Sequence, residues 1–270
     1  MTKALLRLLA VVVCALSGEA ALGAAAVDTE KLAKETQNPV ANLISVPFQN
    51  NFDFGAGPDR DMIWTMNVQP VIPIPLNEEW NVITRTIVPI INQPGLFPGE
   101  SGSFGMGDIN PSVFLSPAAD KGFIWGVGAT TTLPTASLSE LGTGQWSMGP
   151  TAVGLYMEGP WVVGALASQQ WSISGWTDTR VNQLLIQPFL NYNLPDGWYL
   201  TSSPIITGNF SASDGNQWTV PIGGGVGKLW RIGKVGLPLN TSLVPFYNVA
   251  TPDFGPDWQL RFQFQFLFPR

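Results

Sequence analysis

The last stretch of the chain, Trp258 to Phe268, constrains the fold more than any other. Its even-numbered positions are all apolar, and all except Leu260 are aromatic. Its odd-numbered positions carry Gln259, Arg261, Gln263, Gln265 and Leu267. Because successive side chains of a β-strand point to opposite faces, the stretch predicts one strand with an aromatic face and a polar face. An apolar outer face and a wet inner face are what a membrane β-barrel requires of each strand.

The remainder of the chain supplies further strands of this kind. Twelve strand-like runs follow one another, and the eleven connections between them alternate between long and short. Long external loops and short periplasmic turns are typical of outer-membrane barrels. The pattern therefore predicts an all-β fold over residues 41–270, an antiparallel up-and-down transmembrane β-barrel of about 12 strands. The runs are 42–52, 62–76, 80–91, 107–116, 122–133, 145–157, 161–173, 181–193, 198–210, 217–230, 235–248 and 258–268.

Tryptophans and charge agree with a membrane environment. Four tryptophans stand beside predicted short turns and six beside predicted long loops, which predicts two aromatic belts at the two membrane interfaces. Charged residues make up 12% of the chain, about half of the ~25% that is usual. The net charge of −6 argues against nucleic acid as a partner. Outer-membrane lipid is the expected partner.

The N-terminus predicts export. Lys3 and Arg7 precede an apolar core at 8–16, and alanines at 24–26 form a cleavage site, so residues 1–26 are predicted to be a cleaved signal peptide. The expected location is the bacterial outer membrane. Residues 27–40, the most charged stretch, are predicted to be an N-terminal periplasmic segment. A short helix, a tail or a plug are the alternatives for it, and the charge favours a solvated tail.

Stretches throughout the chain carry a family resemblance, and they include NPVANLISVPFQNNFDFG (38–55), GMGDINPSVFLSP (105–117), QPFLNYNLPDGWYL (187–200) and GPDWQLRFQFQFLFP (255–269). They resemble the bacterial outer-membrane transporters grouped as "MetA-pathway of phenol degradation", often mislabelled neuromedin U. The resemblance covers nearly all of the chain after the signal peptide. It implies an outer-membrane barrel with a transport role, but it carries no mechanism, because the family has no agreed substrate or catalytic residues. The final strand also resembles the carboxy-terminal signal of outer-membrane barrels, which implies the barrel-assembly machinery as a partner.

The residue inventory excludes several kinds of chemistry. The chain has no histidine, and its one cysteine, Cys14, lies in the predicted signal peptide. A Ser-His-Asn hydrolase mechanism is thereby excluded, as are sites for zinc or copper built on histidine or thiolate. The glycine-rich run 223–228 lacks the residues and the helix of a phosphate loop, and we interpret it as a strand that bends or that clears lumen space. We expect no enzyme, no cofactor and no metal.

The informative residues are those predicted to line the lumen. Most are uncharged amides; the predicted charges are Arg85 and Arg261, with Asp108 as their expected counter-charge. An interior with few charges suits small neutral or aromatic solutes, and these polar groups could equally satisfy one another in a closed interior. The candidates are Gln49, Asn51, Arg85, Asp108, Asn110, Gln183, Gln187, Arg261, Gln263 and Gln265.

Three hypotheses for function follow. The first is a channel or transporter-like barrel through which small solutes pass. The second is a closed structural or interaction barrel whose external loops bind a partner. The third is a secreted soluble β-sandwich that binds carbohydrate through its tryptophans.

Overall fold

The computed structural model describes residues 29–96, 99–118, 122–233 and 236–268. The predicted signal peptide, residues 1–26, lies outside this part of the chain. Among the described residues, no helix is long and apolar enough to cross a membrane.

The fold is a closed antiparallel β-barrel of 12 strands, as the sequence predicts. Four of the 12 are each divided into two segments, so that 16 strand segments are numbered. A helix, α2 (Thr29–Thr36), precedes the barrel, and two short 3-10 helices, η1 (Ser139–Leu141) and η2 (Pro195–Gly197), lie in connections. The segments are β1 (Ile44–Ala56), β2 (Asp61–Val68), β3 (Val71–Pro75), β4 (Trp80–Gln93), β5 (Ser103–Met106), β6 (Asn110–Pro117), β7 (Gly122–Thr132), β8 (Gln145–Glu158), β9 (Trp161–Gly175), β10 (Asn182–Asn193), β11 (Trp198–Ser202), β12 (Ile206–Asn209), β13 (Trp218–Gly223), β14 (Gly225–Ile232), β15 (Leu237–Ala250) and β16 (Trp258–Phe268).

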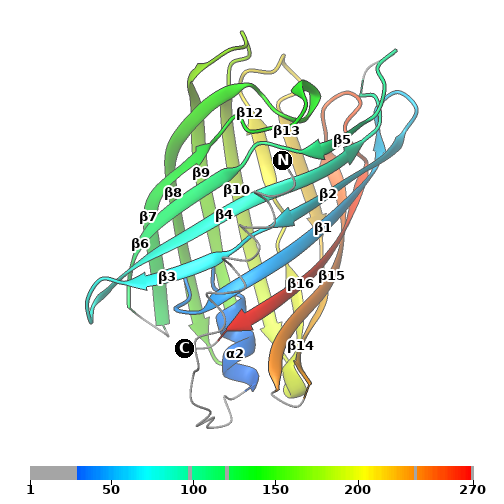
Figure 1. Ribbon diagram of the computed structural model, residues 1–270. Helices are drawn as coiled ribbons and strands as arrows, with labels where there is room; N and C mark the ends of the chain where they lie inside the picture. Colours follow the sequence, from blue (N-terminus) through cyan, green and yellow to red (C-terminus); the bar gives the residue numbers. More distant parts are fainter. Residues whose placement is uncertain (1–28, 97–98, 119–121, 234–235, 269–270) are drawn as a thin grey trace.

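The barrel closes where the first strand meets the last. β1 pairs antiparallel with β16 in an unbroken register from Ile44 opposite Phe268 to Phe54 opposite Trp258. On the outer side of this seam, Phe48 stacks on Phe264 with ring centroids 4.9 Å apart. Figure 1 shows β1 and β16 side by side, with the strands tilted relative to the barrel axis. Closure leaves no free strand edge, as a sheet inside a membrane requires.

Proline and glycine divide the interrupted strands, because proline has no N–H to donate and glycine packs poorly. One interruption opens a gap in the ladder around residues 203–205. The pairing of β10 with β11 ends at Leu190 opposite Ser202, and its pairing with β12 ends at Ile186 opposite Ile206. Residues 187–189 of β10 are therefore not paired with residues 203–205. Pro188, Pro204 and Pro221 all lie in or beside this gap.

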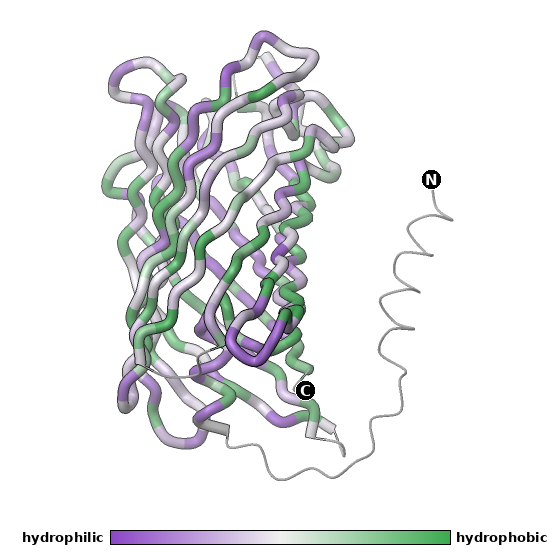
Figure 2. The backbone as a smooth tube through the Cα atoms, turned by 90° about the vertical axis from the view of Figure 1, so that its left-hand side faces the viewer, coloured by the Kyte–Doolittle hydropathy of each residue, from purple (hydrophilic) through white to green (hydrophobic). Residues whose placement is uncertain are grey.

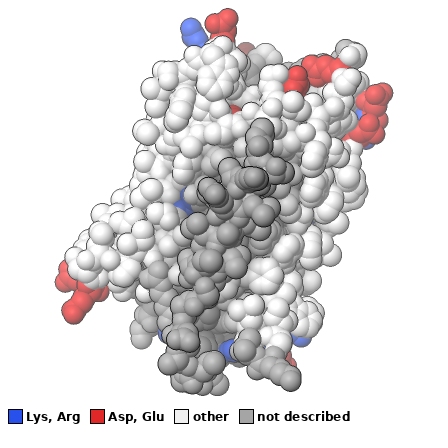
Figure 3. Space-filling view, in the orientation of Figure 1, with Lys and Arg blue, Asp and Glu red and all other residues white. Residues whose placement is uncertain are grey.

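The outward surface of the barrel is apolar. Large apolar side chains at alternate strand positions are well exposed, which in a membrane means contact with lipid. On the face drawn in Figure 3, acidic residues gather at the two ends of the molecule and leave a mostly uncharged band between them. Figure 2 shows hydrophilic residues concentrated in the loops at both ends. Examples of the exposed apolar residues are Val113, Leu115, Phe123, Val163, Leu200 and Leu243.

Tryptophans occupy both rims of this band. Near the short turns, Trp80 packs edge-on against Trp125 at 5.9 Å, and Lys228 lies 4.6 Å from the ring centroid of Trp198 and 4.3 Å from that of Trp230. Near the long loops, Trp146 and Trp258 are exposed. Indole rings favour the membrane–water interface, so these rims mark the thickness of the membrane-facing band.

Candidate solute-binding chamber inside the barrel

A cavity of about 170 Å³ lies inside the barrel, bounded by β1, β3, β4, β10, β11, β15 and β16. We call it the chamber. Its wall mixes amide and hydroxyl groups with two arginines and a few aromatic and aliphatic side chains, and residues from the segment before β1 close it from below. The amide and hydroxyl residues of the strands and their links are Ser45, Gln49, Gln69, Gln187, Asn191, Tyr199, Thr201, Ser203, Asn240, Ser242, Gln263 and Gln265.

The floor of the chamber is formed by residues 29–43, which we call the plug. Leu32 and Ala33 of α2, together with Ala41 and Leu43, form a buried apolar cluster with Leu229 and Leu267 of the barrel wall. Gln37 and Asn193 exchange two amide hydrogen bonds of 2.9 and 3.2 Å. Figure 1 shows α2 at the short-turn end of the barrel. The prediction of a solvated tail is therefore wrong, because the apolar side of this charged segment is fully buried.

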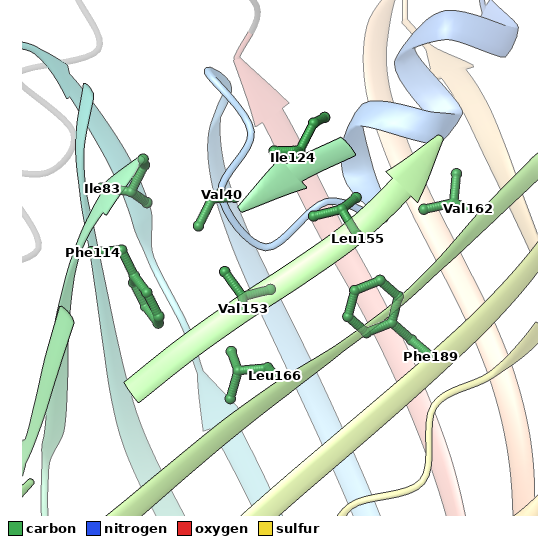
Figure 4. Packing of buried hydrophobic residues seen from close by; sticks show 9 residues of the cluster. All are labelled: Val40, Ile83, Phe114, Ile124, Val153, Leu155, Val162, Leu166 and Phe189. Atoms are coloured by element: carbon green, nitrogen blue, oxygen red, sulfur yellow. The ribbon is translucent and has the colours of Figure 1, made fainter. Parts of the chain in front are cut away.

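Val40 fixes the other side of the plug. It belongs to a buried apolar cluster whose other members come from β4, β6, β7, β8, β9 and β10 (Figure 4). Gly126 leaves the room that Val40 occupies: a Cβ built on Gly126 would lie 3.2 Å from Cγ1 of Val40. This wall of the barrel is apolar on its inner face, a feature that the predicted polar lumen residues did not include. The plug thus contacts two separate parts of the barrel wall.

Arg261 extends into the interior, and each of its three nitrogens donates a hydrogen bond. Its Nε donates to Asn51 Oδ1 at 3.1 Å, its Nη1 to the Ser203 carbonyl at 2.7 Å and its Nη2 to Gln259 Oε1 at 3.0 Å. Its guanidinium carbon also lies 4.7 Å from the centroid of the Phe246 ring. Ser203 belongs to the strand that carries β11 and β12, so this arginine ties distant parts of the wall together.

The acid associated with Arg261 is Asp53, which the sequence analysis did not single out. Asp53 Oδ1 accepts a 2.6 Å hydrogen bond from Gln259, whose Oε1 in turn accepts from Arg261. Asp53 is an alternate residue to Gln49 and Asn51 along β1 and therefore points to the same face of the strand. This alternation could have identified Asp53 as an interior residue.

Arg85 has a different environment. It lies on β4 and lines the chamber, and among the described residues its one hydrogen bond is from Nη2 to Gln69 Oε1 at 2.6 Å. Gln69 is itself buried, in the link between β2 and β3. Both arginines predicted for the lumen therefore border the same cavity; among the described residues, Arg261 has several hydrogen-bond partners and Arg85 has a single neutral one.

Most other candidates also turn inward, at different heights. Gln49, Gln187, Gln263 and Gln265 line the chamber, while Asn51 is buried between Gln49 and Arg261. Asn110 is held by the β7 strand: its Nδ2 donates to the Thr131 carbonyl and to Thr132 Oγ1, both at 2.9 Å. Gln183 is an exposed residue near the start of β10 and does not border the chamber.

Asp108 is not the counter-charge of either arginine, so that expectation is wrong. Its carboxylate accepts from the backbone N–H of Ala136 at 3.0 Å and from that of Thr143 at 2.8 Å. It therefore organises the loop between β7 and β8. The alternation of side chains along a strand could not show this, because the strand is interrupted at 107–109 and Asp108 lies in the break between β5 and β6.

The glycine-rich run serves packing. A Cβ on Gly227 would overlap the ring of Tyr199, which reaches across to donate its hydroxyl to Asn240 Oδ1 at 3.0 Å. The interpretation as a strand that clears space inside the barrel agrees with this contact. In the described part of the chain, no group of three or more histidine, cysteine, aspartate or glutamate side chains is placed to hold a metal ion.

Comparison with known proteins gives a likeness of fold. No family model matches the chain, and no curated protein matches it. Among solved structures, the COG4313 outer membrane channel from Pseudomonas putida F1 is similar over 84% of this chain and 94% of its own, with a TM-score of 0.61 and 15% identity. The closed barrel and this likeness support the predicted location in the bacterial outer membrane.

More distant barrels include an enzyme. Outer membrane phospholipase A from Escherichia coli matches over 90% of this chain and 99% of its own, with a TM-score of 0.42 and 15% identity. A Pseudomonas aeruginosa FadL homologue matches over 84% of this chain and 89% of its own, with a TM-score of 0.38 and 9% identity. The expectation that the protein is not an enzyme is corrected here, because barrels of this general architecture include enzymes as well as channels.

Proposed function

We propose that the protein is an outer-membrane channel for small neutral or aromatic solutes. The observation that carries the proposal is the chamber of about 170 Å³ between the barrel walls, lined mainly by amides and hydroxyls. Such groups hydrogen-bond to a passing solute without the desolvation cost of burying a charge. In this proposal Gln49, Gln187, Gln263 and Gln265 line the solute path, and the plug controls its periplasmic end.

The likeness to a channel of known structure supports the general class, and the resemblance to the transporters grouped under phenol degradation adds the aromatic solute. The final strand, β16, would be the segment that the barrel-assembly machinery recognises. Its outward phenylalanines and its place at the seam support this assignment.

Two measurements test the channel. The full mature chain, reconstituted into planar bilayers, should give discrete conductance steps, and vesicles that contain it should swell in isotonic solutions of small neutral solutes. Swelling rates should fall steeply as solute size increases, because the chamber is narrow. Heat-denatured protein provides the control. The absence of both conductance and swelling would contradict the proposal. This absence would have to hold for the wild type and for a variant whose plug no longer packs against the barrel wall.

A second candidate is a closed structural or interaction barrel whose external loops bind a partner. The plug and the saturated hydrogen bonds of Arg261 favour it. Its loops are also tied together: Arg60 pairs with Asp257, and Asn216 Nδ2 donates to Asp253 at 3.0 Å. The swelling assay separates the two candidates, since a closed barrel gives no swelling with either form of the plug.

A further inference from the structure

Arg85 is a partly buried cation, and most of its donors have no partner among the described residues. A guanidinium has five N–H donors, and within the described part of the chain the one hydrogen bond of Arg85 is the 2.6 Å contact to Gln69. Among the described residues no carboxylate forms an ion pair with it. Its neighbours across the ladder, Val71 and Ser112, are uncharged. A cation that is partly withdrawn from solvent and has no counter-charge beside it favours the binding of an anion.

The rest of the chamber does not supply that anion. Glu35 is the one acidic residue among the described residues that line the chamber, and its carboxylate lies 3.8 Å from Lys31 Nζ. Asp53 is linked through Gln259 to Arg261 rather than to Arg85. Among the described residues, Arg261 therefore has several hydrogen-bond partners, whereas Arg85 has one and lines the chamber with its remaining donors.

Size and wall chemistry restrict the ligand. A cavity of about 150 Å³ holds a benzene molecule, and the chamber measures about 170 Å³. Phe189, Tyr199 and Val244 are among the apolar residues of its wall. A carboxylate matches the planar fork of a guanidinium and can accept two parallel hydrogen bonds from it.

We propose that Arg85 is the anion-binding residue of the chamber and that its ligand is a single-ring aromatic monocarboxylate. The inference rests on the proposed channel function. It narrows the proposed aromatic solutes to those that carry one negative charge. Gln69 acts as the positioning residue, because its hydrogen bond fixes one edge of the guanidinium and leaves the other edge for the ligand.

The test is equilibrium binding to the full mature chain in detergent micelles, measured by titration calorimetry with sodium benzoate and with its neutral isostere benzamide. Benzoate should bind the wild type at least about tenfold more tightly than benzamide, a difference of about 1.4 kcal/mol. Arg85→Gln should lower benzoate affinity to the benzamide level and leave benzamide affinity unchanged. The matched control Arg231→Gln removes the same charge from an exposed position at the barrel end and should bind benzoate like the wild type.

Folding of each variant is checked by heat-modifiable gel mobility. Should Arg85→Gln fail to fold, Arg85→Lys takes its place and should weaken benzoate binding while preserving a preference over benzamide. Equal affinity for benzoate and benzamide in the wild type, or unchanged benzoate binding in Arg85→Gln, overturns the proposal. Acetate or phosphate binding as tightly as benzoate would overturn the aromatic part of it. Because binding is measured without transport, benzoate binding without conductance would contradict only the channel, and conductance without benzoate binding would contradict only this site.

Discussion

Arg261 on the last strand donates its Nε hydrogen to Asn51 Oδ1 on the first strand, 3.1 Å away, and so joins the two strands that close the barrel from the inside. The same guanidinium binds Ser203 and Gln259, and it lies over the Phe246 ring. A single side chain therefore couples the seam to a strand three positions away along the wall.

Replacing Arg261 by methionine should destabilise the barrel by about 3 kcal/mol or more, because several buried acceptors lose their donor at once. Urea unfolding in lipid vesicles, followed by gel mobility, measures the loss. Arg231→Met is the control, since that residue is exposed at the barrel end, and it should unfold near the wild-type midpoint. A midpoint for Arg261→Met equal to that of the control would show that the network does not hold the seam.

The outward phenylalanines of β16 should tolerate charge poorly. Phe264 lies on the lipid side, where it stacks on Phe48, whereas Gln263 lines the chamber. Phe264→Lys should cost about 2–4 kcal/mol if the residue lies near the membrane midplane. Gln263→Lys should cost much less, because its ammonium group reaches the polar chamber. Folding yield into vesicles measures both, and equal yields would show that the faces of this strand are assigned incorrectly.

The strands could be predicted from the sequence because membrane β-strands alternate strictly between lipid and interior. The parity of Phe264 and Gln263 identified the two faces of β16, and the alternation of long and short connections gave the strand count. Both signals are local and repeated. Where a strand is interrupted, alternation no longer predicts the direction of a side chain. For this reason Asp108 was predicted to line the lumen, although it holds the loop between β7 and β8.

The plug and the apolar inner wall could not be predicted in the same way, because they depend on contacts between distant segments. α2 has a charged composition that is typical of a solvated tail, yet Leu32 and Ala33 share one side of it and are buried. The recess for Val40 depends on Gly126, which is far away in the chain. Among the described residues no carboxylate pairs with Arg85, and this too depends on which distant segments surround it in the folded chain.

Gly126→Val should release the plug. The added side chain would compete with Val40 for one recess, where even a Cβ lies 3.2 Å from Val40 Cγ1 and 3.4 Å from Val153 Cγ1. Overpacking of this kind costs about 1–3 kcal/mol, so we expect trypsin to cleave after Lys31 or Lys34 about tenfold faster than in the wild type. Peptide mapping of timed digests measures the rate.

Gly154→Val is the matched control, because a Cβ there meets ring atoms of Phe123 at an ordinary 3.5 Å. Its cleavage rate should equal that of the wild type. Equal protection of α2 in both variants would mean that Val40 does not hold the plug.

Gly227→Ala should destabilise the barrel, whereas Gly224→Ala, three residues earlier in the same glycine-rich run, should not. A methyl group at Gly227 would overlap the ring of Tyr199, whose hydroxyl is fixed by its 3.0 Å hydrogen bond to Asn240. At Gly224 the nearest atom is the Thr201 carbonyl oxygen at 3.4 Å, an ordinary contact. Overpacking at Gly227 costs about 1–3 kcal/mol, and the urea midpoint in vesicles should fall accordingly. If both variants unfold together with the wild type, Tyr199 can move aside, and the glycine at 227 is not required to clear space for it.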